Sequence, residues 1–509
     1  MKKILALVLT LMLVLGAVAA LAAAGDLTVD AKVSVTGFQA GDTVTAYQFI
    51  TWDAANNNWK VAEGVGLTLA QITDGLTKDE LATLASNVDK MTAVTGTTNG
   101  TTWEYTCGTV ATAGSYLILV ASSTAEYIYN PAVVSADFDG TNSAAVELTN
   151  DAATIKKQPV TLTKEADNAP DDYDVQVGDI VPFTVTVTVP EYNDNWTEPT
   201  FQVTDVLSTG LTLEVLPTIE GLTAGTDYTL SGAKGDHTFT ISFSETYLKS
   251  NASAVLEIKY SALVGEAVKD TAQVHEELNK VTLTFSNDPT NKNSHKTIDD
   301  ETHHYTFAID ASRFGSTSEK TTELLKVGVD KDGTPVTVKK ESDPYPTGIS
   351  PLAGAEFTLT GVGPGPNGTP NGYSMTATSS EDGRMFFNNL EVGTYILTET
   401  KAPAGYIKDQ STHEVVITAE YNDDTTLKSY TITVDGKATS TYSATTENGQ
   451  IKVIDKGVNN ESFMVNNKKG VELPSTGGMG TTILYVGGSI LVLAAVILLI
   501  TKRRMKAED

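Results

Sequence analysis

Polar residues stand at inward positions of three predicted strands in the middle of the chain. Alternate residues of a strand face the same side of a sheet. Lys164, Asp205 and Asn287 each continue the phase of apolar neighbours along their own strand. Those neighbours are Val160 and Leu162, Phe201 and Val203, and Val281, Leu283 and Phe285. The alternation therefore predicts that a lysine, an acid and an amide point into one core.

The same three residue types recur, in the same chain order, nearer the C-terminus. They are Lys326, Glu399 and Asn467. Their apolar neighbours in phase are Leu324, then Tyr395 and Leu397, then Phe463 and Val465. Asn466 is an alternative to Asn467, because a β-bulge would exchange the faces of the two. Burying an unpaired charged lysine costs several kcal/mol, so both sets need an explanation.

Two explanations fit such a set of residues. One is a buried ion pair with an amide beside it. The other is a spontaneous isopeptide bond between the lysine and asparagine side chains. Burial lowers the pKa of the lysine, which leaves a neutral amine nucleophile, and raises the pKa of the acid, which when protonated polarises the amide carbonyl and assists loss of ammonia. Such a bond would close a loop of roughly 100 residues, worth about 4 to 5 kcal/mol by the chain-entropy argument for disulfides.

The C-terminal end combines a short motif, an apolar span and a basic tail. The motif consists of Leu473, Pro474, Ser475, Thr476 and Gly477. Residues 483–500 are about long enough to span a bilayer as a helix, and the basic tail 501–509 should stay in the cytoplasm. This order resembles the cell-wall sorting signal of Gram-positive surface proteins, although a plain single-span membrane protein is the alternative. The resemblance implies that a sortase cuts between Thr476 and Gly477 and passes the Thr476 carbonyl to an amine.

The N-terminal end has the pattern of a cleaved secretory leader, residues 1–24. Two lysines precede an apolar run and a stretch of small residues. Cleavage is expected near Ala24, with Ala22 or Ala19 as alternatives, and an uncleaved anchor is the other interpretation. The sequence therefore indicates export.

Short alternating runs bounded by turn residues predict an all-β chain of sandwich domains. One helix is expected over residues 78–88, because Thr77 and Glu80 form a capping-box pattern. The predicted parts are a signal peptide 1–24, an N-terminal domain 25–158, a middle domain 159–293, a connector 294–320, a third domain 321–470, the motif 473–477, the membrane helix 483–500 and the tail 501–509.

Composition excludes several classes of function. A net charge of −28 argues against binding to nucleic acid. Cys107 is the only cysteine, so it cannot form a disulfide within the chain, and it is expected to be a buried apolar residue. His303 and His304 are interpreted as part of a solvated connector rather than a metal site. No set of residues for substrate turnover, cofactor binding or metal binding is apparent, so we expect neither an enzyme nor a cofactor.

Four segments resemble the major, or backbone, pilin subunits of sortase-assembled pili. Segments 204–211 and 285–289 resemble the family's middle domain of collagen-adhesin A type, and segments 352–357 and 395–406 resemble its B-type domain and the E-box. The resemblance covers essentially the whole chain and implies tandem immunoglobulin-like domains. It implies isopeptide bonds from Lys164 to Asn287 and from Lys326 to Asn467, with Asp205 and Glu399 as the catalytic acids.

Polymerisation of such pilins needs an exposed lysine on the next subunit. The family presents it in a Tyr-Pro-Lys-Asn-like motif before the middle domain, where this chain instead has residues 155–158, Ile-Lys-Lys-Gln. Lys157 fits the position of the linking lysine best, Lys156 is the alternative, and a solvated basic linker is the other interpretation.

The sequence thus predicts the structural major subunit of a pilus on a Gram-positive cell wall, held transiently in the membrane by its C-terminal helix. The expected partners are sortase, other copies of the chain, accessory pilins, peptidoglycan through sortase, and surface ligands of host or neighbouring cells. A monomeric wall-anchored adhesin or an accessory pilin is the alternative.

Overall fold

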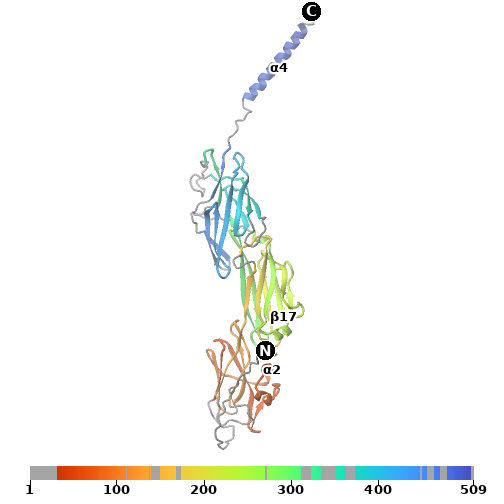
Figure 1. Cartoon of the computed structure of the whole chain (residues 1–509), viewed down its shortest axis with the longest axis vertical. Coiled ribbons are helices and arrows are strands. Elements are labelled where there is room, and N and C mark those ends of the chain that lie inside the picture. The colour runs from red at the N-terminus through yellow and green to blue at the C-terminus, as the bar shows by residue number, and fades with distance from the viewer. Residues whose placement is uncertain are drawn as a thin grey trace. The chain divides into compact units, whose positions relative to one another are not determined.

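A computed structural model shows that the chain divides into two compact units (Figure 1). The first contains residues 1–269, 276–305 and 423–426, and the second contains residues 270–275, 306–422 and 427–509. The structure describes residues 31–109, 112–136, 138, 150–167, 173–269, 272–310, 323–333, 350–362, 373–447, 450–455, 463–470 and 479–505. The predicted leader and the motif 473–477 lie outside these residues, and the boundaries of the three predicted domains stay predictions.

The first unit begins with two small sheets that enclose their own hydrophobic core. One sheet has the order β10 (Asp151–Thr154), β1 (Ala31–Thr36), β6 (Thr102–Cys107) and β5 (Thr97–Asn99). The other has the order β3 (Asn58–Val61), β2 (Thr43–Asp53), β7 (Gly114–Ala121) and β9 (Ala132–Ala136), with β4 (Thr92–Val94) also paired to β2. Cys107, at the end of β6, is buried in this core as expected.

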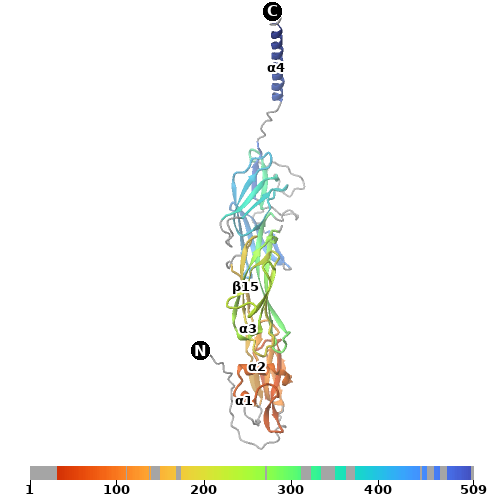
Figure 2. The ribbon, with the colours of Figure 1, turned by 90° about the vertical axis from the view of Figure 1, so that its right-hand side faces the viewer.

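Two short helices accompany these sheets, α1 (Leu69–Thr73) and α2 (Lys78–Ser86) (Figure 2). The side chain of Thr77 accepts a hydrogen bond from the Glu80 backbone N–H, and the Glu80 side chain accepts one from the Thr77 backbone N–H. This capping box satisfies two donors that a helix start leaves unpaired. The predicted helix at this position is confirmed.

A second core of the first unit lies between two sheets that form a sandwich. In one sheet the order is β12 (Leu162–Ala166), β13 (Ile180–Thr188), β18 (Val255–Val264) and β15 (Leu211–Ile219). The facing sheet contains β16 (Tyr228–Ser231), β17 (Thr238–Phe243), β14 (Phe201–Leu207), β19 (Val274–Ser286) and β20 (His295–Ile309). A short helix, α3 (Glu245–Ser250), follows β17. Every second residue of β13 is buried, as its alternation predicts.

The predicted connector 294–320 is wrong for its first half, because residues 295–309 form the long strand β20. Its early residues alternate between exposed and half-buried positions, which is why they appear polar in the sequence. His304 is fully buried, and burial lowers the pKa of its imidazole to about 3. His303 lies beside Glu276, with 2.8 Å between Nδ1 and Oε1. The histidine pair is therefore part of the sandwich and not of a solvated linker.

The second unit consists mainly of a seven-stranded sheet, a parallel pair of strands and a long helix. The sheet has the order β23 (Ser374–Thr378), β22 (Glu356–Gly361), β25 (Gly393–Lys401), β26 (Thr412–Tyr421), β27 (Leu427–Val434), β28 (Lys437–Glu447) and β29 (Gln450–Asp455). The parallel pair is β21 (Leu324–Val329) with β30 (Phe463–Lys468), and β24 (Phe387–Leu390) pairs with the end of β20. The chain is thus mostly β, as predicted.

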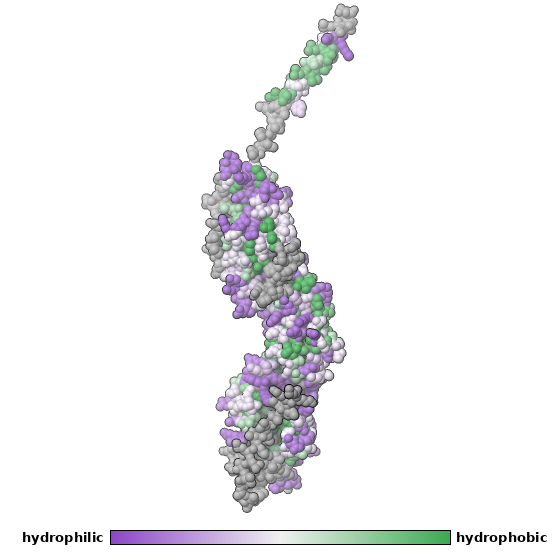
Figure 3. All heavy atoms as spheres, in the orientation of Figure 1, coloured by the Kyte–Doolittle hydropathy of each residue, from purple (hydrophilic) through white to green (hydrophobic). Residues whose placement is uncertain are grey.

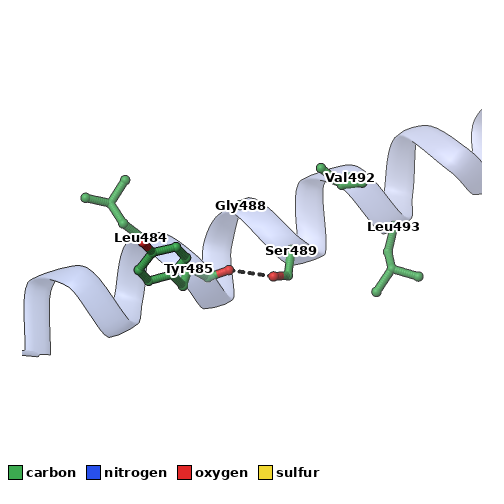
Figure 4. Close-up of a pocket in the computed structure, with 6 residues that line it drawn as sticks. All are labelled: Leu484, Tyr485, Gly488, Ser489, Val492 and Leu493. Atoms are coloured by element: carbon green, nitrogen blue, oxygen red, sulfur yellow. Dashed lines mark hydrogen bonds between the residues drawn. The ribbon is translucent and has the colours of Figure 1, made fainter.

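The C-terminal helix is α4 (Met479–Met505). Its stretch of 21 residues from Ile483 to Arg503 is long and apolar enough to cross a membrane, and its apolar part is not buried in the structure. Its surface is largely hydrophobic (Figure 3). Figure 4 shows Leu484, Tyr485, Val492 and Leu493 extending outward around a shallow hollow on the helix, where the Ser489 hydroxyl donates to the Tyr485 carbonyl. A hydroxyl satisfied by its own helix can enter lipid at little cost.

Candidate functional site

A buried lysine joins the two sheets of the sandwich in the first unit. Lys164 lies on β12, which is an edge strand of one sheet, whereas Asp205 on β14 and Asn279 on β19 belong to the facing sheet. The Lys164 Nζ atom donates hydrogen bonds to Asp205 Oδ2, to Asn279 Oδ1 at 2.7 Å and to the hydroxyl oxygen of Tyr260 at 2.7 Å. The Lys164 and Asp205 side chains have no exposed surface, so this cluster is sealed from water.

Asn287 does not reach this cluster, which corrects the prediction that it pairs with Lys164. Its Nδ2 atom donates to the Ser122 carbonyl at 3.1 Å, and its Oδ1 atom accepts from the Ser294 hydroxyl at 3.0 Å. Asn279 and Asn287 have the same phase, but eight residues of extended chain separate them by roughly 26 Å. Asn287 follows the last residue of β19, so it lies beyond the level of Lys164 and Asp205.

Burial sets the protonation of the lysine and the acid. It lowers the pKa of Lys164 to about 8, although the neighbouring Asp205 carboxylate works in the opposite direction. It raises the pKa of Asp205 by more than Lys164 lowers it. Aromatic rings line the amine, whose Nζ lies 5.3 Å from the centre of Phe183. Moving one proton from the lysine to the acid makes both neutral, and an apolar site favours that state.

The second unit contains a cluster built from different elements. Lys326 lies on β21 and Asn467 on β30, and these parallel strands are paired so that Gly328 is opposite Asn467. Glu399 comes from β25 of the seven-stranded sheet. Its Oε1 atom lies 3.3 Å from Lys326 Nζ, and its Oε2 atom accepts a hydrogen bond from Asn467 Nδ2 at 2.7 Å. The structure therefore brings all three predicted residues together.

Hydrogen bonding in this second cluster is incomplete, although Lys326 and Glu399 form an ion pair. Among the described residues, Lys326 Nζ, Glu399 Oε1 and Asn467 Oδ1 are buried without a hydrogen bond. Burial lowers the pKa of Lys326, and its Nζ lies 5.1 Å from the centre of the Phe357 ring. A buried amide carbonyl without a hydrogen-bond partner is costly, so the state in which Lys326 and Asn467 have not reacted is destabilised.

Asn467, rather than its neighbour Asn466, faces the acid. Asn467 is fully buried and Asn466 is exposed, so β30 keeps its alternation without a bulge at this point. The Nδ2 atom of Asn467 also donates to the Ile407 carbonyl at 2.8 Å. The sequence left the choice between the two amides open, and the buried position of Asn467 beside Glu399 favours Asn467.

Both candidate linking lysines are exposed. Lys157 begins β11 (Lys157–Pro159), which pairs with β8 (Tyr127–Tyr129), and its Nζ lies 4.0 Å from the centre of the Tyr127 ring. Lys156 precedes this strand, and its carbonyl accepts a hydrogen bond from the Asn130 N–H. Exposure alone does not distinguish them, so the assignment of Lys157 stays a prediction.

Asn279 and Tyr260 are the two residues of the sites that sequence reasoning missed. Asn279 carries the same alternation signal as Asn287, and a search for every inward amide on the strand would have found it. Tyr260 lies two residues after Ile258 on a strand with regular alternation, so it appears in the sequence as an ordinary core aromatic. Nothing in the sequence indicates that its hydroxyl has polar partners.

Two family models match parts of the chain. Residues 334–433 match a prealbumin-like fold domain, and residues 465–507 match the LPXTG cell wall anchor motif. The T6 backbone pilin of serotype M6 Streptococcus pyogenes, which has a modular three-domain structure, superimposes with a TM-score of 0.59 at 19% identity, over 87% of this chain and 100% of that one. The chain has the fold of a major pilin and ends in a cell-wall anchor.

Curated relatives of this pilin-fold protein agree with that assignment. The trypsin-resistant surface T6 protein of Streptococcus pyogenes serotype M6 is 24% identical over 93% of this chain and 95% of its own length. The fimbrial subunit type 2 of Actinomyces naeslundii is 28% identical, but over only 45% of each chain. The anchor places this protein on the surface of a Gram-positive cell and implies a sortase as its partner.

Proposed function

We propose that this protein is the structural major subunit of a covalently polymerised pilus. Sortase would cut after Thr476 and join its carbonyl to Lys157 of the next copy. The observation that carries the proposal is the pair of buried lysine, acid and asparagine clusters in a chain that ends in a cell-wall anchor. Partners of a finished pilus would include accessory pilins and surface ligands of other cells.

Each cluster is proposed to form one isopeptide bond, Lys164 to Asn279 and Lys326 to Asn467. The neutral lysine Nζ attacks the asparagine Cγ, the Cγ–Nδ2 bond breaks, and ammonia leaves with one proton taken from Nζ. Low polarity helps because it favours the neutral amine, and the attack joins a neutral amine to a neutral amide. The reaction happens once per molecule, so the protein acts as material and not as an enzyme with turnover.

In the sandwich, the bond would join the two facing sheets. Lys164 belongs to the β12 sheet and Asn279 to the β19 sheet, and the two residues are 115 positions apart along the chain. Tension on the chain would then pass from β12 to β19 through the bond rather than through the strands between them.

The decisive experiment compares wall extracts boiled in detergent from wild-type cells and from Lys157→Ala and Lys156→Ala cells. We expect a ladder of covalent oligomers in the wild type and in Lys156→Ala, and only monomer in Lys157→Ala. The two lysines are adjacent and both exposed, so each variant controls for the other. A wild-type extract that contains monomer alone would show a singly anchored adhesin and contradict the polymer.

The rate of the Lys164 reaction is expected to depend on pH. With a pKa of about 8, the fraction of neutral amine falls about tenfold for each pH unit below 7. Chain made by cell-free synthesis and transferred to buffers from pH 5.5 to 8 should form the Lys164–Asn279 bond more slowly as pH falls. The measurement is the time course of the cross-linked tryptic peptide by mass spectrometry. A rate that rises on acidification would contradict the proposed nucleophile.

A further inference from the structure

The hydroxyl of Tyr260 contacts all three reacting groups of the sandwich site. It accepts hydrogen bonds from Lys164 Nζ at 2.7 Å and from Asn279 Nδ2 at 2.9 Å, and it donates to Asp205 Oδ2 at 2.8 Å. These are the attacking nitrogen, the leaving nitrogen and the acid of the proposed reaction. No other described residue is hydrogen-bonded to all three.

Aromatic neighbours hold the ring of Tyr260 in place. It stacks on Phe183, with 5.2 Å between ring centres, and Phe239 meets it edge to face at 4.8 Å. Phe183 is also the direct partner of Tyr260 across the β13 and β18 pair. A ring packed on two sides has little freedom to turn away, so the position of the hydroxyl is set before the reaction.

Asp205 does not itself contact the amide nitrogen of its asparagine, whereas Glu399 of the other site does. Glu399 is long enough for its Oε2 atom to take a hydrogen bond from Asn467 directly. Asp205 is one methylene shorter: its Oδ2 atom contacts Lys164 and Tyr260, and its Oδ1 atom has no hydrogen-bond partner among the described residues. Through Tyr260, Asp205 is connected to the amide nitrogen of Asn279, whereas Lys164 connects it only to the amide oxygen.

We propose that Tyr260 is a catalytic residue that delivers the proton to the leaving nitrogen. This role rests on the proposed isopeptide bond between Lys164 and Asn279. As Lys164 Nζ bonds to Cγ, the amide resonance ends and Nδ2 gains a lone pair that accepts the Tyr260 proton. The protonated Asp205 gives its Oδ2 proton to the Tyr260 oxygen, which reverses the direction of their hydrogen bond. Nζ then gives its own proton to Asp205 Oδ2. The Cγ–Nδ2 bond breaks, ammonia leaves, and Tyr260 and Asp205 end in their starting forms.

The surroundings of Tyr260 keep its hydroxyl protonated before the reaction. Burial and the adjacent Asp205 carboxyl raise the pKa of the phenol well above its usual value, so the hydroxyl keeps its proton until a base is formed beside it. General acid catalysis of this type typically contributes a factor of 10² to 10⁴ in rate. The proposal thus accounts for a buried tyrosine hydroxyl that a purely apolar core would not need.

The test uses Tyr260→Phe in the full chain, made by cell-free synthesis and sampled over time for cross-linked tryptic peptides. We expect the Lys164–Asn279 peptide to form about 100-fold more slowly, while the Lys326–Asn467 peptide forms at the wild-type rate in the same molecules. Tyr192→Phe is the matched control, because Tyr192 is also buried in this core but its hydroxyl donates to the Thr200 and Ser286 carbonyls. Equal rates for Tyr260→Phe and wild type overturn the proposal, as does an equal loss in Tyr192→Phe.

A second measurement separates proton delivery from packing. Fluorotyrosine in place of Tyr260 keeps the ring but lowers the pKa of the phenol, so it should shift the pH profile of bond formation at this site alone. A profile identical to that of wild type would show that Tyr260 only fills space. If wild-type protein forms no Lys164–Asn279 peptide at all, the isopeptide assignment itself fails, and that outcome is distinct from a fast Tyr260→Phe variant.

Discussion

Asn279→Ala is expected to prevent one of the two isopeptide bonds, so the intact mass of the secreted protein should be lower by one ammonia instead of two. Its thermal stability should fall sharply. Without the bond, the chain from Lys164 to Asn279, which are 115 positions apart, is no longer closed as a loop. The chain-entropy argument assigns about 4.7 kcal/mol to a loop of this size. For a domain of roughly 150 residues this corresponds to a fall in Tm of about 15 °C.

Asn287→Ala is the matched control for that experiment. It removes an inward amide of the same phase, together with hydrogen bonds to Ser122 and Ser294, but it leaves Lys164, Asp205 and Asn279 untouched. We expect the mass of Asn287→Ala to show both ammonia losses. Its free energy of unfolding should fall by about 1 to 3 kcal/mol, which is the cost of leaving buried groups unpaired. If instead Asn287→Ala shows only one ammonia loss and Asn279→Ala shows both, the predicted bond from Lys164 to Asn287 is right and the assignment to Asn279 is wrong.

Glu399→Ala is expected to have an even larger effect, on the other unit. Glu399 is the acid that contacts both Lys326 and Asn467, so its removal should prevent their bond and leave the lysine buried without a counter-charge. Loss of loop closure is worth about 5 kcal/mol, and an uncompensated buried charge adds about 3 to 5 kcal/mol. We expect this unit to become sensitive to trypsin, which mass spectrometry of timed digests would show.

Glu356→Ala tests whether that loss is specific. Glu356 is also a strand glutamate paired with a lysine, Lys401, at 2.7 Å, but the pair is exposed. Exposed pairs contribute at most about 1 kcal/mol, so this variant should keep both ammonia losses and resist trypsin like the wild type. Equal sensitivity of the two variants would mean that Glu399 acts only as a general contributor to stability.

Alternation along strands predicted most of the candidate residues, because it depends only on neighbours in the chain. It placed Lys164, Asp205, Lys326, Glu399 and Asn467 inside the protein, and all five are buried. It also predicted the buried phase of β13, and the capping box predicted helix α2. These features need no knowledge of which strands are neighbours in space.

Alternation could not choose between Asn279 and Asn287, because both satisfy it. Only strand pairing distinguishes them: Asp205 is opposite Val281, which puts Asn279 two residues from that level and Asn287 beyond the end of β19. The polar start of β20 was predicted to be a connector for a related reason. A strand that is half exposed at one end has the composition of a linker until its pairing is known.

Four features of this chain could be predicted without the structure: its export, its sorting signal, its β-rich fold, and two buried sets of lysine, acid and amide. Each of these depends on local composition or on the period of one strand. The tertiary structure decided which amide meets which lysine, and it brought the Tyr260 hydroxyl between them. Those contacts join strands far apart in the chain, and their distances depend on sheet order and register, which no single segment of sequence contains.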